Sequence, residues 1–133
     1  MNNFSKTVSA IVLGLLVSAC VGPDTSRTDL APLRVVSSTA GAVLANSAGM
    51  TLYTHKDDAP GKSACYGRCA RKWPPAEAVP GETVDGPLSI IERSDGKRQY
   101  AYNGKALYTW VKDKSPGDAT GDKRGEVWFV ARP

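Results

Sequence analysis

Two cysteines four positions apart, Cys65 and Cys69, are the residues of this chain best suited to carry chemistry. In an oxidising compartment such a pair is expected to form a disulfide. On a regular helix the Cβ atoms at this spacing would lie ~5–6 Å apart, whereas a disulfide needs ~3.5–4.5 Å. We therefore expect either that Gly67 lets the backbone deform and the bond forms, or that both thiols stay free. The disulfide is the main prediction.

The alternative use of this pair is metal binding or thiol exchange. Two thiolates favour soft ions such as Cu(I), and Met50 or His55 would supply a third ligand. The spacing also occurs in copper-delivering thioredoxin-like proteins, but those need a βαβ core and a downstream histidine. Here the only histidine lies upstream, and no Cys-x-x-Cys-His segment for covalent haem occurs. We expect no cofactor, and a copper or thiol-redox site at Cys65 and Cys69 remains the alternative.

Other residue sets that suggest chemistry do not fit in detail. The acidic loop 113–125 suggests calcium, but position 12 of an EF-hand loop counted from Asp113 is Arg124 instead of Glu. Asp58 and Asp113 are better explained as side chains that accept backbone N–H bonds in their Pro-Gly turns. The chain contains no Gly-x-Ser-x-Gly elbow and no pair of metal-binding histidines. We expect that the protein is not an enzyme.

The chain contains an internal repeat. Residues 49–61 align with residues 104–117 after one insertion, and each copy has a glycine turn, a Leu-Tyr-Thr strand, an Asp and Pro-Gly. Residues two apart on a strand share a face, so Tyr53 and His55 should point one way and Leu52 the other. The aromatic side chains either pack in the core or line a ligand groove. The repeated positions of interest are Tyr53, Asp58, Tyr108, Trp110 and Asp113.

These residues must be positioned mainly by strands. Asp95-Gly96 and Asn103-Gly104 are two-residue hairpin signals. They join the strand-like runs 88–93, 98–102 and 105–111, and so predict a three-stranded antiparallel meander.

Further strands are expected at 42–45, 50–54 and 127–131, the first two joined as a hairpin. Ser63 would cap a short helix near Cys65–Lys72, and Pro74 would end it. The predicted fold class is mostly β: a small antiparallel meander built from two pseudo-repeats, with one short helix.

The second repeat copy resembles a known family. Tyr108-Thr-Trp110-Val-Lys-Asp113 fits the Tyr-x-aromatic-x-x-Asp motif of predicted bacterial lipoproteins, also called secreted repeats of unknown function. The resemblance covers about residues 40–133, and in the first copy His55 stands where the motif has an aromatic residue. Also similar are Cys65–Cys69 with the following Trp-Pro-Pro, the run 95–99 and the run 125–128. The resemblance implies an envelope location and a β fold, and no reaction.

The N-terminus predicts export and lipidation. Residues 1–19 have a polar start ending in Lys6, an apolar run and the small residues Ser18 and Ala19, as in a secretory signal. Cys20 directly after Val-Ser-Ala resembles the lipobox, whose thiol takes a diacylglycerol before cleavage. Because Val21 replaces the Asp of an inner-membrane retention signal, we expect an outer-membrane protein that faces the periplasm.

The remaining chain is expected to form a tether and one domain. Residues 20–33 contain two prolines and small polar residues, which favours a flexible tether. Residues 34–133 would form a single β-rich domain. The basic residues are spread along the chain, with one local cluster at Lys62, Arg68, Arg71 and Lys72. We expect solvated surface there, with contact to an anionic lipid or an acidic small molecule as the alternative, and a periplasmic location makes nucleic acid an unexpected partner. We therefore expect a binding module that reaches the membrane through its lipid and binds an unknown protein or small ligand.

Overall fold

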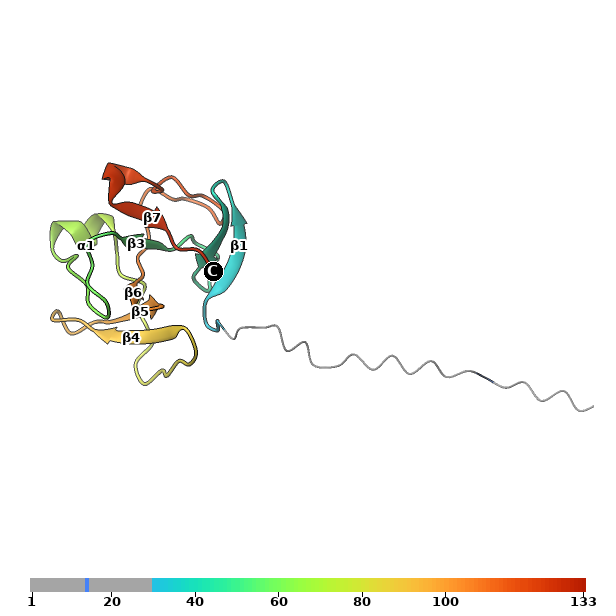
Figure 1. The fold of residues 1–133 in the computed structure, drawn as a ribbon, viewed down its shortest axis with the longest axis horizontal. Coiled ribbons are helices and arrows are strands. Elements are labelled where there is room, and N and C mark those ends of the chain that lie inside the picture. The colour runs from blue at the N-terminus through green and yellow to red at the C-terminus, as the bar shows by residue number, and fades with distance from the viewer. Residues whose placement is uncertain (1–13, 15–29) are drawn as a thin grey trace, which may run out of the picture.

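The computed structural model describes Gly14 and residues 30–133, and these residues form a mostly β structure of short strands. Figure 1 shows β3, β7 and helix α1 at one end of the molecule and β4 with β5 at the other, with β1 at the side. Two sheets have two strands and one has three, all antiparallel, which confirms the predicted fold class. The elements are β1 (Arg34–Ser38), β2 (Gly41–Ala45), β3 (Tyr53–His55), α1 (Arg68–Lys72), β4 (Leu88–Glu92), β5 (Arg98–Tyr102), β6 (Lys105–Ala106), the 3-10 helix η1 (Arg124–Glu126) and β7 (Trp128–Val130).

The predicted meander is confirmed as the sheet β4-β5-β6. Asn103 and Gly104 both have positive φ, at 48° and 79°, as a type I′ turn requires. The two-residue turn predicted at Asp95-Gly96 is wrong: the Arg93 N–H donates to the Lys97 carbonyl oxygen at 2.9 Å and only Gly96 has positive φ, so a three-residue loop closes this hairpin. The third strand is shorter than the expected run 105–111. It ends at Ala106 because Tyr108 turns away from β5 and forms bridges with Tyr53 and Pro75.

The predicted hairpin of residues 42–45 and 50–54 is only partly correct. The turn forms, since the Asn46 N–H donates to the Met50 carbonyl oxygen at 3.0 Å. However, the returning chain pairs with β2 only as an isolated bridge at Thr51, and the hairpin partner of β2 is β1. β3 pairs instead with β7, from the other end of the chain.

The helix is also shorter than predicted. It begins at Arg68, because Gly67 has φ +55° and ψ −122°, a left-handed conformation that breaks the helix and favours glycine. Cys65 therefore lies before the helix. Ser63 does not cap it, and its Oγ instead accepts a hydrogen bond from the Cys65 N–H at 3.3 Å.

The two repeats exchange their C-terminal segments. The Ala76 N–H of the first half donates to the carbonyl oxygen of Leu107 in the second half, at 2.9 Å. The Ala131 N–H of the second half donates to Leu52 in the first half, at 2.8 Å. Each Leu-Tyr-Thr strand is thus completed by chain from the other repeat, whereas the sheets β1-β2 and β4-β5-β6 form locally.

Two buried clusters form the core, and the Leu-Tyr-Thr strands separate them. Tyr53, Tyr108 and Trp110 belong to one cluster, whereas Leu52 and Leu107 belong to the other. This confirms the predicted facing of these strands, with side chains alternating between the two faces.

The folded part begins before Arg34. Leu33 is buried in the second cluster and Leu30 packs against it, so the end of the expected tether belongs to the domain. Residues 1–19, Cys20 and the tether up to residue 29 lie, apart from Gly14, outside the described residues. Among the described residues, no helix has the length and apolar character needed to cross a membrane.

Candidate functional site

The repeated tyrosines and aspartates bind one another across the two repeats. The Tyr53 hydroxyl donates to Asp113 Oδ2 at 2.6 Å, and the Tyr108 hydroxyl donates to Asp58 Oδ2 at 2.5 Å. The backbones of Tyr53 and Tyr108 also exchange N–H···O bonds of 2.8 and 2.9 Å. The tyrosine of each copy therefore contacts the aspartate of the other, around a local pseudo-two-fold axis.

The second oxygen of each aspartate holds a neighbouring loop. Asp58 Oδ1 accepts from the Ala64 N–H at 3.0 Å, and Asp113 Oδ1 accepts from the Thr120 N–H at 2.9 Å. This confirms the predicted turn-holding role of both aspartates. Both carboxylates and both tyrosines are buried. We conclude that these four repeated side chains join the two repeats and do not face a ligand.

The aromatic residues of the repeats form a buried stack beside this axis. Trp73 lies between Trp110, at 4.1 Å between ring centroids, and Trp128, at 4.0 Å. His55 is the residue of the first copy that corresponds to Trp110 in the second copy. Its ring meets that of Trp128 edge-on, with 4.5 Å between the ring centroids. The Arg124 guanidinium lies over the Trp110 ring at 4.7 Å. Core packing is thus the main role of the predicted aromatic set.

A buried arginine connects this axis to the cysteine loop, and the sequence analysis missed it. Arg93 Nη1 donates to Ser63 Oγ at 2.9 Å, and Ser63 Oγ lies 2.6 Å from the Tyr108 hydroxyl. Arg93 Nη2 donates to the Cys65 carbonyl oxygen at 2.8 Å. The guanidinium beside Asp95 also holds the pKa of that carboxyl below its usual value. In the sequence, the position of Arg93 just before the Asp-Gly turn was the only indication of this role, and an arginine at such a position is usually a surface residue.

Cys65 and Cys69 form a disulfide, with their Cα atoms 5.2 Å apart. That distance is within the range for disulfides because Gly67 bends the chain between them. The main prediction for this pair is confirmed. Since both sulfurs are bonded, neither is available in this structure as a thiolate ligand for copper.

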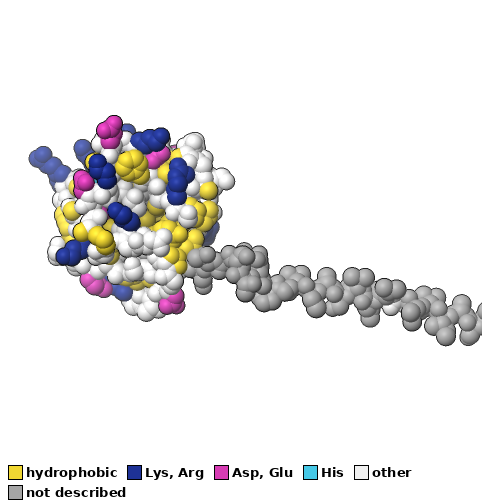
Figure 2. All heavy atoms as spheres, viewed as in Figure 1, with side chains coloured by type: hydrophobic (Ala, Val, Ile, Leu, Met, Phe, Trp, Pro, Cys, Tyr) yellow, Lys and Arg dark blue, Asp and Glu magenta, His cyan; other side chains and the backbone are white. Residues whose placement is uncertain are grey.

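A groove of about 490 Å³ lies between α1 and β7 beside this disulfide. Its walls carry three cations. Figure 2 shows several Lys and Arg side chains, with some Asp and Glu among them, on the upper half of the visible face. Trp73 reaches the groove with its edge, because Trp110 and Trp128 cover its two faces. The lining residues are Arg68, Cys69, Arg71, Lys72, Trp73 and Trp128.

The cations of this groove are not neutralised within the described residues. The ion pairs among the described residues involve Arg93, Lys97 and Arg98, and none involves a side chain of α1. The part of the chain that the structure describes also contains no group of three or more His, Cys, Asp or Glu side chains that could hold a metal ion. The groove is therefore suited to an anion.

The fold and the site define a small β protein in which two repeats complete each other around an aromatic core. The family model described as a secreted repeat of unknown function matches the chain twice, over residues 34–77 and 89–132. The protein belongs to this family, and the two matches confirm the two repeats. No curated protein and no solved structure matches the chain. The resemblance to the family is confirmed, and the short Tyr-x-aromatic-x-x-Asp motif stays a prediction.

The exchange of hydrogen bonds predicts equal effects at the two tyrosines. Tyr53→Phe and Tyr108→Phe should each lower the free energy of unfolding by about 1.5–3 kcal/mol, since each removes a buried hydrogen bond to a carboxylate. Urea unfolding followed by circular dichroism measures this. Tyr102→Phe is the control, because Tyr102 is half-buried and its hydroxyl forms no hydrogen bond with a described residue. Losses no larger than in this control would contradict the structural role of the pairs.

Proposed function

We propose that this protein is a lipid-anchored cell-envelope protein that binds an anionic ligand without transforming it. Membership of a secreted family supports a location outside the cytoplasm. The Val-Ser-Ala-Cys20 segment supports a lipid anchor, and Val21 supports the outer membrane with the domain facing the periplasm. The observation that carries the binding role is the groove with three unpaired cations between α1 and β7.

The groove also indicates what kind of anion it takes. Arg68 and Arg71 would bind phosphate or carboxylate oxygens through their planar guanidinium groups, and Lys72 adds a point charge. The tryptophan edges beside them are apolar. A ligand that combines an anionic group with an apolar part is therefore complementary to the groove, and a phosphate on an aliphatic body is the simplest example.

Titration with a short-chain phosphatidic acid tests the proposal. Dihexanoyl phosphatidic acid, below its micellar concentration, should bind the purified protein in neutral maltoside micelles with a saturable calorimetric signal. The variant R68Q/R71Q/K72Q should bind it about tenfold more weakly or worse, because charge-assisted hydrogen bonds are lost. Binding should also weaken as salt is raised, since these side chains are exposed.

A matched variant controls for net charge. Arg34, Lys105 and Lys112 are exposed, lie outside the groove and form no ion pair with a described residue. R34Q/K105Q/K112Q should therefore bind dihexanoyl phosphatidic acid with the affinity of the unchanged protein. Dihexanoyl phosphatidylcholine should bind neither the unchanged protein nor this variant. Equal losses in both triple variants would show a diffuse charge effect and would overturn the groove as the binding site.

A further inference from the structure

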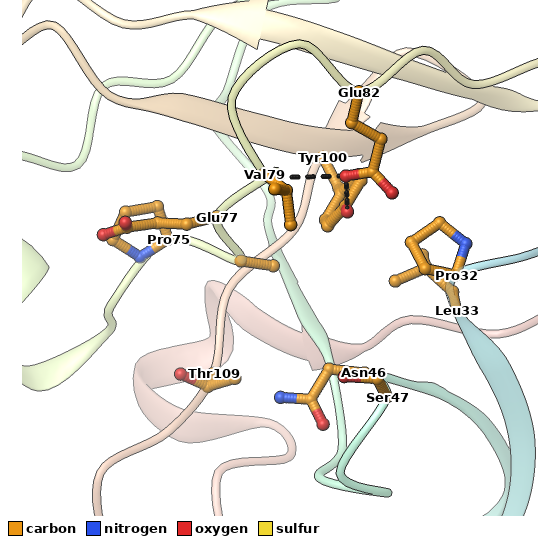
Figure 3. A pocket seen from close by; sticks show the side chains of 11 residues that line it. Pro32, Leu33, Asn46, Ser47, Pro75, Glu77, Val79, Glu82, Tyr100 and Thr109 are labelled. Atoms are coloured by element: carbon orange, nitrogen blue, oxygen red, sulfur yellow. Dashed lines mark hydrogen bonds between the residues drawn. The ribbon is translucent and has the colours of Figure 1, made fainter.

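A second cavity of about 390 Å³ lies away from the groove, between the two halves of the molecule. Figure 3 shows its lining side chains, which come from the segment before β1, the turn after β2, the segment after α1, strand β5 and the segment after β6. Val79 and Glu82 in its wall lie between the two family matches, which end at residue 77 and resume at residue 89. This cavity therefore uses chain that the shared repeat does not contain.

Glu82 is held in place in this cavity by one of its two carboxylate oxygens. Glu82 Oε2 accepts a hydrogen bond from the Val79 N–H at 3.1 Å and another from the Tyr100 hydroxyl. Its other oxygen points into the space between Tyr100 and Pro32 (Figure 3) and accepts no hydrogen bond from a described residue. The carboxylate is thus fixed in orientation and has one free acceptor.

The charge of Glu82 is not compensated. Glu82 is half-buried, and no Lys or Arg of the described residues forms an ion pair with it. Arg98 of β5 donates to the Glu82 backbone carbonyl oxygen, and its charge is paired with Glu92. Because removing a carboxylate from water is costly without a partner, this position favours a ligand that brings a positive charge.

Asn46 provides a fixed donor on the opposite side of the cavity (Figure 3). Its Oδ1 accepts from the Ala48 and Met50 N–H groups, both at 3.0 Å, which leaves Nδ2 without an acceptor among the described residues. The lining is mixed, and its apolar part includes Pro32 and Leu33 and, at the rim, the 64% exposed side chain of Val79.

We infer that this cavity is a second binding site, for a small aliphatic ammonium ligand that also carries a carbonyl oxygen. The ammonium would donate to the free oxygen of Glu82, and the carbonyl would accept from Asn46 Nδ2. The apolar side chains of the lining, including Val79, would cover the aliphatic part. The N-terminal end of a peptide has this chemistry.

Two probes that differ by one charge test the inference. L-alanyl-L-alaninamide carries the ammonium, and its N-acetyl form lacks it while keeping the carbonyls. Binding to the ¹⁵N-labelled protein in maltoside micelles is followed through the amide signals of Val79 and Glu82. The free dipeptide amide should shift them saturably, and the acetylated form should bind about tenfold more weakly or worse, as expected for loss of a charge-assisted hydrogen bond.

Substitutions in the same loop locate the effect. Glu82→Gln keeps the shape of the side chain and removes its charge. It should therefore lower the affinity for L-alanyl-L-alaninamide about tenfold or more, and the variant should no longer bind this probe more tightly than the acetylated form. Asp85→Asn removes a charge from an exposed residue of the same loop outside the cavity, and it should leave the affinity unchanged. No saturable shift, equal affinity for both probes, or equal losses in the two variants would each overturn the site. None of these outcomes depends on the groove beside α1.

Discussion

Replacing Trp73 with alanine is expected to lower the free energy of unfolding by about 3–5 kcal/mol, the range for deleting a buried tryptophan. Trp73 is 5% exposed, and its ring lies between those of Trp110 and Trp128. Tyr53 meets the same ring edge-on at 5.2 Å. The substitution would open a cavity where the two repeats meet, and a small domain has only ~5–15 kcal/mol of stability in total. Urea unfolding measured by circular dichroism checks the prediction.

Two further variants show whether this loss reflects the repeat symmetry. Trp128→Ala should cost a similar amount, because Trp128 takes the place of Trp73 in the second repeat and is also buried. Val111→Ala is the control, since the side chain of Val111 is 42% exposed and its loss should change stability by less than about 0.5 kcal/mol. A Trp73→Ala variant as stable as this control would show that the stack does not hold the repeats together.

The protein is expected to lose stability steeply in alkali. Burial and the neighbouring Asp113 raise the pKa of Tyr53, and burial and the neighbouring Asp58 raise that of Tyr108. Burial and Glu82 raise the pKa of Tyr100 to about 12. Since all three pKa values are higher in the folded state, the stability they contribute is complete below the unfolded pKa of ~10 and is lost as pH rises towards the folded values.

The slope of this loss can be measured. Each tyrosine that ionises only in the unfolded chain lowers the free energy of unfolding by about 1.4 kcal/mol per pH unit. Urea unfolding at pH 8, 9, 10 and 11 should therefore show a plateau followed by a fall. Tyr100→Phe should make the fall shallower between pH 10 and 11. An unchanged slope in this variant would contradict the raised pKa of Tyr100.

The proposed binding sites and the repeat motif use different residues. The residues most visible as a repeated pattern, such as Tyr53 and Asp113, are buried and hold the two halves together. The residues with unused binding capacity, such as Arg71 and Glu82, lie outside that pattern. A repeated motif in this protein therefore marks the shared scaffold, and ligand specificity is expected in the segments that surround it.

The sequence by itself determined the features that depend on neighbouring residues. Asp95-Gly96 and Asn103-Gly104 set the meander, because tight turns are encoded by the residues within them. The repeat was visible because each copy keeps its own strand and turn chemistry. The Cys65–Cys69 bond was predictable because two cysteines four positions apart, with a glycine between them, can form a disulfide.

Only the tertiary structure decided which distant partners meet. The same Tyr and Asp residues could have paired within one repeat, but Tyr53 pairs with Tyr108 of the other repeat and its hydroxyl donates to Asp113. Arg93 could not be predicted as a buried residue, because its partners Ser63 and the Cys65 carbonyl oxygen come from a loop far away in the chain. Local sequence encodes turns and alternation of side chains, whereas the exchange of segments between the repeats follows from burying two aromatic faces against each other.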